Sequence, residues 1–231
     1  LGCKANQADG IALADGLAAR LPGMELVNPR DVSDADVVVV NTCTVTHTAD
    51  ADARQIVRRF RRSNPDAKIV VTGCYAQTDR EALEAMPEID HVVGNAAKAS
   101  IPGLIERLVT GTEAPGWKRE GNREWNPTLR DAANIRKLRQ GRSRPFLKVQ
   151  DGCNYVCSFC IIPRARGTSR SIGIDQVVAE VARYQVLGAR EIVLSGIHLG
   201  HWGRDLTPRR TFGAMLTELL ERTDVQRFRI S

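Results

Sequence analysis

Three cysteines in the run GCNYVCSFCIIPRARG are the residues best placed to do chemistry. Three residues separate Cys153 from Cys157 and two separate Cys157 from Cys160, so one short loop carries three thiols. A structural zinc site needs four protein ligands and usually takes a second cysteine pair, which does not follow here. Three thiolates suit a cubane iron–sulfur cluster with one iron open to another ligand. The alternatives are incidental cysteines, or zinc completed by the distant His198 or His201.

The remaining cysteines form a second set of three: Cys3, Cys43 and Cys74. Cys43 follows the run DVVVVN and Cys74 follows KIVVTG, and both runs are typical of buried parallel strands. Ligands of open α/β sheets bind outside the carboxyl ends of the strands, so these two cysteines should share one edge. Cys3 precedes a helical pattern and would lie at the same edge if a strand comes before it. The alternative is that all three are small buried hydrophobic residues.

Composition and length exclude several classes of protein. Six cysteines in 231 residues are far fewer than a disulfide scaffold carries. The longest apolar runs are too short to span a bilayer, and no signal stretch is evident. We therefore expect a cytoplasmic protein without membrane association, whose thiols act as metal ligands. With 42% hydrophobic residues the chain can build about two domains.

The elements that must position the cysteines alternate between helix and strand. The hydrophobic patterns of residues 1–112 predict a parallel sheet with covering helices. Strands are expected at 36–41, 68–73 and 91–94, and helices at 6–20, 47–62, 78–86 (opened by Thr78) and 98–109.

A second βα series occupies residues 145–231. Strands are expected at 146–150, 191–196 and 226–231, and helices near 174–187 and 211–222. Such a series is too short to close a barrel, so we expect a fragment of a longer enzyme: an α/β protein with a parallel-sheet domain followed by the first part of a (βα) barrel.

A basic linker, residues 113–144, separates the two predicted domains. From Gly116 to Lys148 there are ten basic and three acidic residues, with Trp117 and Trp125 among them. Clustered positive charge with aromatic residues fits an RNA loop, and a solvated spacer is the alternative. A second basic surface is expected on helix 47–62, and it too fits either RNA binding or simple solvation. Its residues are Arg54, Arg58, Arg59, Arg61 and Arg62.

With Phe159 directly before its third cysteine, the first set resembles the signature of the radical S-adenosylmethionine (SAM) enzymes. The resemblance implies that SAM binds the open iron and is cleaved to a 5′-deoxyadenosyl radical, with Phe159 beside the adenine. Ser195 and Gly196, at the end of a predicted strand, are candidate SAM contacts, because glycine at a strand end lets a ligand approach the backbone.

Both cysteine sets, their order and their local sequences resemble the methylthiotransferases over essentially the whole chain. That family implies two [4Fe-4S] clusters: an auxiliary one on Cys3, Cys43 and Cys74, and the radical SAM cluster on the loop of Cys153, Cys157 and Cys160. The segments LGCKANQ, NTCTVTH and SGIHLG resemble the subfamily that acts on N6-threonylcarbamoyladenosine in tRNA. The subfamilies for isopentenyladenosine and for a ribosomal protein typically carry Gln-Met or Pro-Lys in place of Lys4-Ala5.

The resemblance implies a transferase that adds a methylthio group near the tRNA anticodon, supplied by an electron donor and a sulfur source. From the resemblance we also expect a carboxyl half of the barrel and a terminal RNA-binding domain that this sequence does not include. Two other classes stay open: a non-catalytic zinc module that binds RNA, and a radical SAM enzyme whose first domain binds a cobalamin.

Two groups of residues have more than one interpretation. His198 and His201 either face the active cavity or are satisfied structural residues. Arg164, Arg166 and Arg170 either meet a phosphate or the SAM carboxylate, which suit guanidinium groups, or form a solvated basic loop.

Overall fold

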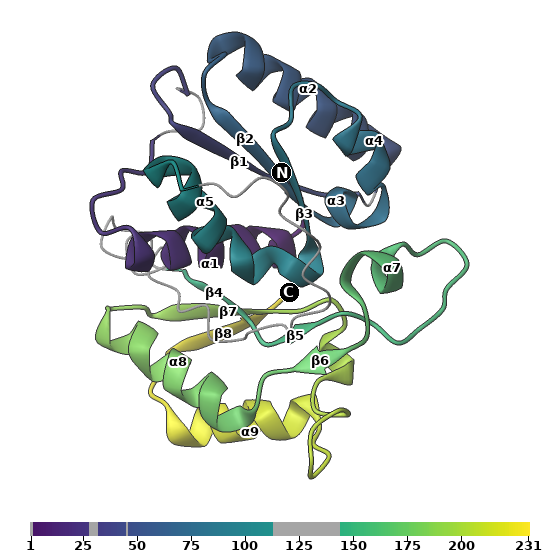
Figure 1. Ribbon diagram of the computed structural model, residues 1–231. Coiled ribbons are helices and arrows are strands. Elements are labelled where there is room, and N and C mark those ends of the chain that lie inside the picture. Colours follow the sequence, from purple (N-terminus) through teal and green to yellow (C-terminus); the bar gives the residue numbers. More distant parts are fainter. Residues whose placement is uncertain (1, 28–31, 45, 113–143) are drawn as a thin grey trace.

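The computed structural model describes residues 2–27, 32–44, 46–112 and 144–231. Two parallel three-stranded sheets lie one above the other, and helix α1 (Lys4–Arg20) lies between them (Figure 1). The predicted fold class, a parallel-sheet domain followed by the first part of a barrel, is confirmed. The predicted division at a linker stays a prediction, because residues 113–143 lie outside the described ones.

The amino-terminal sheet has the strand order β1-β2-β3, all parallel: β1 (Val37–Thr42), β2 (Lys68–Gly73) and β3 (His91–Gly94). Both faces are buried. On β2, Val70 packs toward α1 and α5 (Ile101–Thr110), and Val71 packs toward α2 (His47–Ser63). Burial on both sides explains why these strands read as unbroken apolar runs.

Of the helices that cover this sheet, α2 begins at the predicted residue, α1 begins two residues earlier than predicted and α5 three residues later. Helix α2 is capped by Thr46 Oγ1, which accepts from Ala49 N at 3.1 Å. The helix predicted over 78–86 exists as the shorter α4 (Arg80–Glu84), but Thr78 does not open it, because an additional helix, α3 (Cys74–Thr78), begins directly after β2 and ends at that residue. Thr78 closes α3 by donating its hydroxyl to Cys74 O. A short 3₁₀ helix, η1 (Asn95–Ser100), precedes α5.

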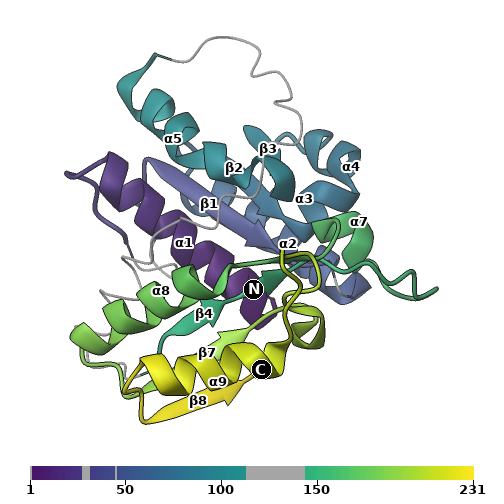
Figure 2. The ribbon, with the colours of Figure 1, turned by 90° about the horizontal axis from the view of Figure 1, so that it is seen from below.

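The carboxy-terminal sheet has the order β4-β7-β8, also parallel, with α8 (Ile174–Val186) and α9 (Phe212–Arg222) on one face (Figure 2). Its strands are β4 (Phe146–Lys148), β7 (Glu191–Ser195) and β8 (Arg227–Ile230). A two-stranded antiparallel ribbon of β5 (Gln150–Asp151) and β6 (Arg170–Ser171), the helix α7 (Ile162–Arg166) and the 3₁₀ turn η2 (Leu199–His201) complete the described elements.

The single strand predicted over 146–150 is wrong, because Val149 divides it. Val149 N donates to Ser195 O of the main sheet, while Val149 O accepts from Ile172 N beyond the ribbon. Residues after Val149 therefore leave the sheet and lead into the cysteine loop.

The two sheets meet through α1, which contacts β4, and through α3, which contacts α7. Helix α3 starts at Cys74, and α7 closes the loop of Cys153, Cys157 and Cys160, so this contact brings the two cysteine sets toward each other. Across the described residues, no helix has the length and apolar character that crossing a membrane requires.

Candidate metal centres

Cys43 and Cys74 lie at the same edge of the first sheet, as predicted, and Cys3 comes next to this edge without a strand before it among the described residues. Thr42 and Gly73 are register partners at the ends of β1 and β2. Cys43 and Cys74 therefore directly follow two neighbouring strands, whose backbones lie about 5 Å apart. Cys3 is the N-cap of α1. Its neighbour Gly2 lies so close to Cys43 that an added Cβ would be 2.9 Å from the Cys43 Cβ.

Gly73 is the residue that allows Cys74 this position. Its φ of +106° is disfavoured for other residues, and an added Cβ would lie 2.2 Å from Thr42 O. The glycine thus lets β2 turn into α3 directly against β1, and Cys74 begins the helix at the sheet edge.

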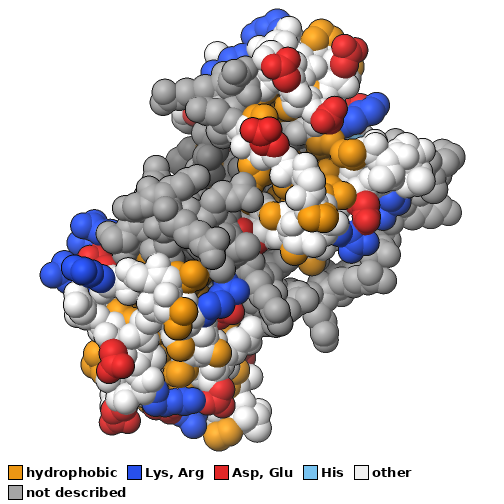
Figure 3. All heavy atoms as spheres, turned by 90° about the vertical axis from the view of Figure 1, so that its left-hand side faces the viewer, with side chains coloured by type: hydrophobic (Ala, Val, Ile, Leu, Met, Phe, Trp, Pro, Cys, Tyr) orange, Lys and Arg blue, Asp and Glu red, His pale blue; other side chains and the backbone are white. Residues whose placement is uncertain are grey.

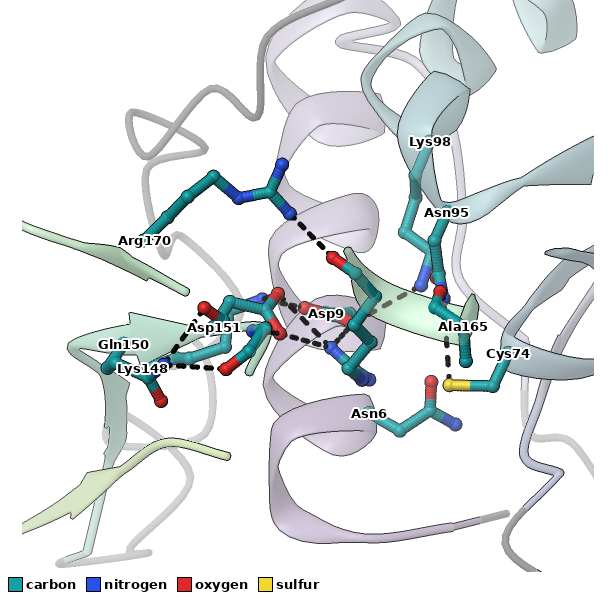
Figure 4. A network of polar contacts seen from close by, with 12 residues as sticks. Asn6, Asp9, Cys74, Asn95, Lys98, Lys148, Gln150, Asp151, Ala165 and Arg170 are labelled. Atoms are coloured by element: carbon teal, nitrogen blue, oxygen red, sulfur yellow. Dashed lines mark hydrogen bonds and ion pairs between the residues drawn. The ribbon is translucent and has the colours of Figure 1, made fainter. Parts of the chain in front are cut away.

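Cys74 is 2% exposed and receives a hydrogen bond from the amide of Asn95, with Nδ2 and Sγ 3.5 Å apart. The same Nδ2 donates to Ala165 O of α7 at 2.7 Å, as Figure 4 shows. Burial raises the pKa of the Cys74 thiol, while Arg166 and the Asn95 hydrogen bond act in the opposite direction. Asn95 therefore connects Cys74 to α7, the helix that follows the loop of Cys153, Cys157 and Cys160. No sequence pattern predicted a role for Asn95.

The second cysteine loop is held at its base by backbone contacts. Cys153 N donates to Gly167 O at 3.0 Å, and Cys160 N donates to Cys157 O at 3.0 Å. Gly152 has a φ of +70°, and an added Cβ would lie 2.0 Å from Thr168 O. The loop therefore passes so close to the segment after α7 that its first residue must be glycine.

Gln150 organises this loop from below and was not predicted. Its side chain is fully buried. Nε2 donates to Gly152 O at 2.7 Å and to Ser169 Oγ at 2.9 Å, and Oε1 accepts from His198 N at 2.8 Å. One amide thus connects both ends of the cysteine loop to the turn after β7.

Among the described residues, no three His, Cys, Asp or Glu side chains already lie close enough together to hold a metal ion. Whether the cysteine sets fit a metal group is therefore judged from the number and type of their donor atoms. Each set offers three thiols without a fourth ligand of its own, which suits an iron–sulfur cluster better than structural zinc. Glycines and buried amides fix the segments that carry Cys74 and Cys153.

Comparison with known proteins gives a consistent result. The model of the "Uncharacterized protein family UPF0004" matches residues 1–94. The threonylcarbamoyladenosine tRNA methylthiotransferase MtaB of Bacillus subtilis is 40% identical over 208 residues, covering 85% of this chain and 43% of that protein. The MtaB of Aquifex aeolicus is 37% identical over 232 residues, covering 100% of this chain and 54% of that protein.

The chain belongs to the methylthiotransferase family. It spans about half the length of the curated relatives that it matches. Among solved structures, the radical SAM methyltransferase TsrM from Kitasatospora setae, with tryptophan and a SAM analogue bound, aligns with a TM-score of 0.54 at 18% identity. The alignment covers 91% of this chain and 47% of that one, which shows a shared fold.

In this methylthiotransferase chain, the predicted SAM contacts lie at the carboxyl end of β7 and on the cysteine loop. Phe159 is 90% exposed on the loop. Ser195 is buried. Gly196 packs so tightly that an added Cβ would lie 2.8 Å from Leu199 Cδ2 and 3.0 Å from Gln150 Oε1. The packing of Gln150 is therefore sufficient reason for a glycine here, and the SAM contact stays a prediction.

His198 and His201 pack against the cysteine loop. Their rings stack at a centroid distance of 3.8 Å, and the Tyr155 ring meets His201 edge-on at 4.6 Å. Burial, His198 and Arg204 together hold the pKa of His201 below its ordinary value. The pair thus supports Tyr155 of the loop, consistent with a structural role.

The arginines after the loop do not form one solvated basic surface. Arg164 is exposed, but Arg166 is 2% exposed in its side chain. Its Nη1 lies 3.1 Å from Asp9 Oδ2 and 3.0 Å from Asp151 Oδ1. The solvated-loop interpretation is therefore wrong for Arg166.

Arg166 belongs to a buried ionic network where the two sheets meet. Figure 4 shows its other members, Asp9, Lys98, Lys148 and Asp151. Asp9 on α1 also pairs with Lys98 of η1 at 3.3 Å and with Lys148 of β4, and Lys148 pairs with Asp151 at 2.8 Å. Burial alone would raise the pKa of Asp9, but Lys148, Lys98 and Arg166 hold it well below its usual range. Burial lowers the pKa of Lys98.

The predicted basic surface of α2 is used partly within the protein. Arg61 donates to Glu88 O, Pro65 O and Ala67 O and pairs with Asp90 at 2.6 Å. Arg54 donates to the Tyr75 hydroxyl. On the face in Figure 3, basic side chains of the described residues lie in several separate groups. The basic run of 116–148 lies mostly outside the described residues.

Proposed function

We propose that the protein is a radical SAM methylthiotransferase that converts N6-threonylcarbamoyladenosine in tRNA to its 2-methylthio derivative. Family membership and the two cysteine sets support the reaction class. The substrate is supported by the two MtaB relatives and by the segments LGCKANQ, NTCTVTH and SGIHLG. The adenine C2–H is neither acidic nor activated for acid–base chemistry, so its replacement calls for a radical.

Each cysteine set has one role in this proposal. Cys153, Cys157 and Cys160 would hold the radical SAM [4Fe-4S] cluster, with Phe159, Ser195 and Gly196 contacting SAM. Cys3, Cys43 and Cys74 would hold the auxiliary [4Fe-4S] cluster. Bound there, the two groups supply an electron for reductive cleavage of SAM and the sulfur for transfer.

The observation that carries the proposal is the contact between the two sites. Asn95 Nδ2 bonds both Cys74 Sγ, at 3.5 Å, and Ala165 O, at 2.7 Å, so one amide spans from the auxiliary set to the helix that follows the radical set. A methylthiolation needs both sites near one carbon atom.

The proposed partners follow from the reaction. The tRNA anticodon loop is the substrate, an external donor supplies electrons, and a sulfur source replenishes the auxiliary site. Modification of tRNA would place the protein in the cytoplasm.

The test uses the full-length protein with tRNA bearing N6-threonylcarbamoyladenosine. Cys43→Ala should still produce 5′-deoxyadenosine from SAM but no methylthio nucleoside, whereas Cys157→Ala should produce neither, as measured by mass spectrometry. Normal methylthio product from Cys43→Ala would overturn the auxiliary role. Product on isopentenyladenosine tRNA or on a ribosomal protein instead would overturn the substrate and keep the mechanism.

A further inference from the structure

The buried ion pairs at the junction of the two sheets connect segments that carry cysteines of both sets. Asp9 lies at their centre, on α1, the helix between the sheets (Figure 4). Its side chain is 8% exposed. Oδ2 lies 3.1 Å from Arg166 Nη1 and 3.3 Å from Lys98 Nζ, and Oδ1 pairs with Lys148. One carboxylate therefore binds cations from both parts of the chain.

On the amino-terminal side, these contacts reach the segments of Cys3 and Cys43. Lys98 Nζ donates to Asn41 Oδ1 at 3.1 Å, and Asn41 lies two residues before Cys43. Asn41 Nδ2 in turn donates to Asn6 O at 2.8 Å, in the first turn of α1, whose N-cap is Cys3. The start of α1 and the end of β1 are thereby connected to Lys98.

On the carboxy-terminal side, the contacts reach the base of the other cysteine loop. Arg166 Nη1 lies 3.0 Å from Asp151 Oδ1, and the same oxygen accepts from Gly152 N at 2.8 Å. Cys153 follows directly, and its N–H donates to the carbonyl of Gly167, the residue after Arg166. The backbone at the start of this loop is therefore connected to Arg166, and through it to the carboxylate on α1.

The use of ion pairs at this junction indicates a need for defined geometry. Buried ion pairs are a weak source of net stability, because both charges lose their hydration, and apolar side chains of similar volume often stabilise as much or more. Charge-assisted hydrogen bonds are short, and a guanidinium presents its donors in a fixed fork. Apolar contact is non-directional by comparison. A junction of ion pairs thus fixes the separation of the two sheets more narrowly.

We propose that Asp9 is a positioning residue, which sets the distance and orientation between the two cysteine sites so that both act on one carbon atom. The inference rests on the proposed function, in which sulfur transfer needs both sites and SAM cleavage needs only one. A misplacement of about 1 Å can cost on the order of 100-fold in a reaction between positioned groups. Loss of the Asp9 carboxylate should therefore lower sulfur transfer far more than SAM cleavage.

The test measures two products of the full-length protein acting on tRNA that bears N6-threonylcarbamoyladenosine: the methylthio nucleoside and 5′-deoxyadenosine. Asp9→Asn should lower the ratio of the first to the second at least about tenfold. Unfolded molecules make neither product, so a purely stabilising role of Asp9 would lower both in parallel and leave the ratio unchanged. Glu106→Gln is the matched control. It breaks an exposed pair between α1 and α5, within the amino-terminal part, and should keep the wild-type ratio.

Asp9→Glu is the second variant, in case Asp9→Asn does not fold. It keeps the charge that pairs with Lys98, Lys148 and Arg166 but lengthens the side chain by one methylene. It should fold and still lower the ratio, because the paired groups are moved apart. A wild-type ratio in folded Asp9→Asn, or in Asp9→Glu where Asp9→Asn does not fold, would overturn the inference and leave the proposed function standing.

The EPR spectrum of the fully reduced protein gives a measurement that does not depend on turnover. Magnetic coupling between two reduced clusters falls steeply with their separation, so the spectrum reports their relative placement. Wild type and Glu106→Gln should share one coupling pattern, and the Asp9 variant should alter it at equal iron content. An unaltered pattern would also overturn the inference. A wild-type protein that assembles both clusters but makes no methylthio nucleoside would instead refute the proposed function, and the inference with it.

Discussion

Replacing Asp9 with Asn should destabilise the protein more than any substitution of a surface ion pair. Among the described residues, Asp9 is the one carboxylate paired with Lys98, whereas Lys148 and Arg166 also pair with Asp151. The amide would preserve the shape and remove the charge. Lys98 would then retain Asn41 Oδ1, 3.1 Å from its Nζ, as a neutral partner.

The expected loss in the free energy of unfolding follows from the Lys98 ammonium, which would stay buried without its carboxylate partner. Removing one partner of a buried ion pair destabilises by about 3–5 kcal/mol. Lys98 can also escape by losing its proton. Deprotonating an ordinary lysine at pH 7 requires about 5 kcal/mol, which sets the upper limit for this site. Because burial already lowers the pKa of Lys98, the loss should stay below that limit.

The assay is urea unfolding of the metal-free full-length protein, followed by the fluorescence of the buried Trp202. Adding Lys98→Met to Asp9→Asn should recover at least about half of the loss, since the ammonium that lost its carboxylate partner is then removed as well. Glu106→Gln is the control. It breaks the exposed pair with Arg20 and should change the free energy of unfolding by less than about 1 kcal/mol.

The pH dependence gives a second measurement of the same site. Because the folded pKa of Asp9 is depressed, its stabilisation is fully present above its ordinary value, 3.8, and is lost as the pH falls below that value. Asp9→Asn should therefore lose less stability than the wild type on acidification. Two results together would refute the reasoning. The double variant would be no more stable than Asp9→Asn, and Asp9→Asn would lose as much stability on acidification as the wild type.

Three further predictions concern the cysteine segments. Gly152→Ala should reduce the iron content at the Cys153 loop. The φ of +70° and the nearby Thr168 O make a side chain at this position unfavourable by more than about 1 kcal/mol, and normal iron content would contradict this. Gln150→Leu should lower the free energy of unfolding by more than about 2 kcal/mol, because buried partners are left unpaired, and an unchanged urea midpoint would argue against it. In metal-free protein, iodoacetamide should modify exposed Cys157 well before buried Cys74, whose raised thiol pKa also slows alkylation; equal rates measured by peptide mass spectrometry would exclude this order.

The strands and the placement of Cys43 and Cys74 could be predicted because local pattern determines them. The apolar runs before both cysteines are long and β-branched, and parallel strands place their carboxyl ends together. Boundaries failed where tertiary contacts decide. Val149 divides the strand predicted over 146–150, because its N–H donates to Ser195 of β7 while its carbonyl accepts from Ile172, beyond the ribbon. Gly73 lets α3 begin earlier than the Thr78 signal indicates.

The ionic network could not be predicted, because its members lie on five separate elements. Nothing in the local sequence marks Asp9 or Lys98 as buried, Lys148 counts with the basic run, and Arg166 is either a contact of phosphate or the SAM carboxylate or part of a solvated loop. Their burial appears only when the two sheets pack around α1. The same holds for Asn95, whose significance depends on the contact between α3 and α7.

The most direct test of the central claim is the metal content of anaerobically reconstituted full-length protein. Two three-cysteine sets, each holding a four-iron cluster, predict about eight iron atoms per chain with matching sulfide. Changing Cys153, Cys157 and Cys160 together to Ala should leave about half of the iron and abolish SAM cleavage. Stoichiometric zinc with little iron or sulfide in strictly anoxic material would contradict the account.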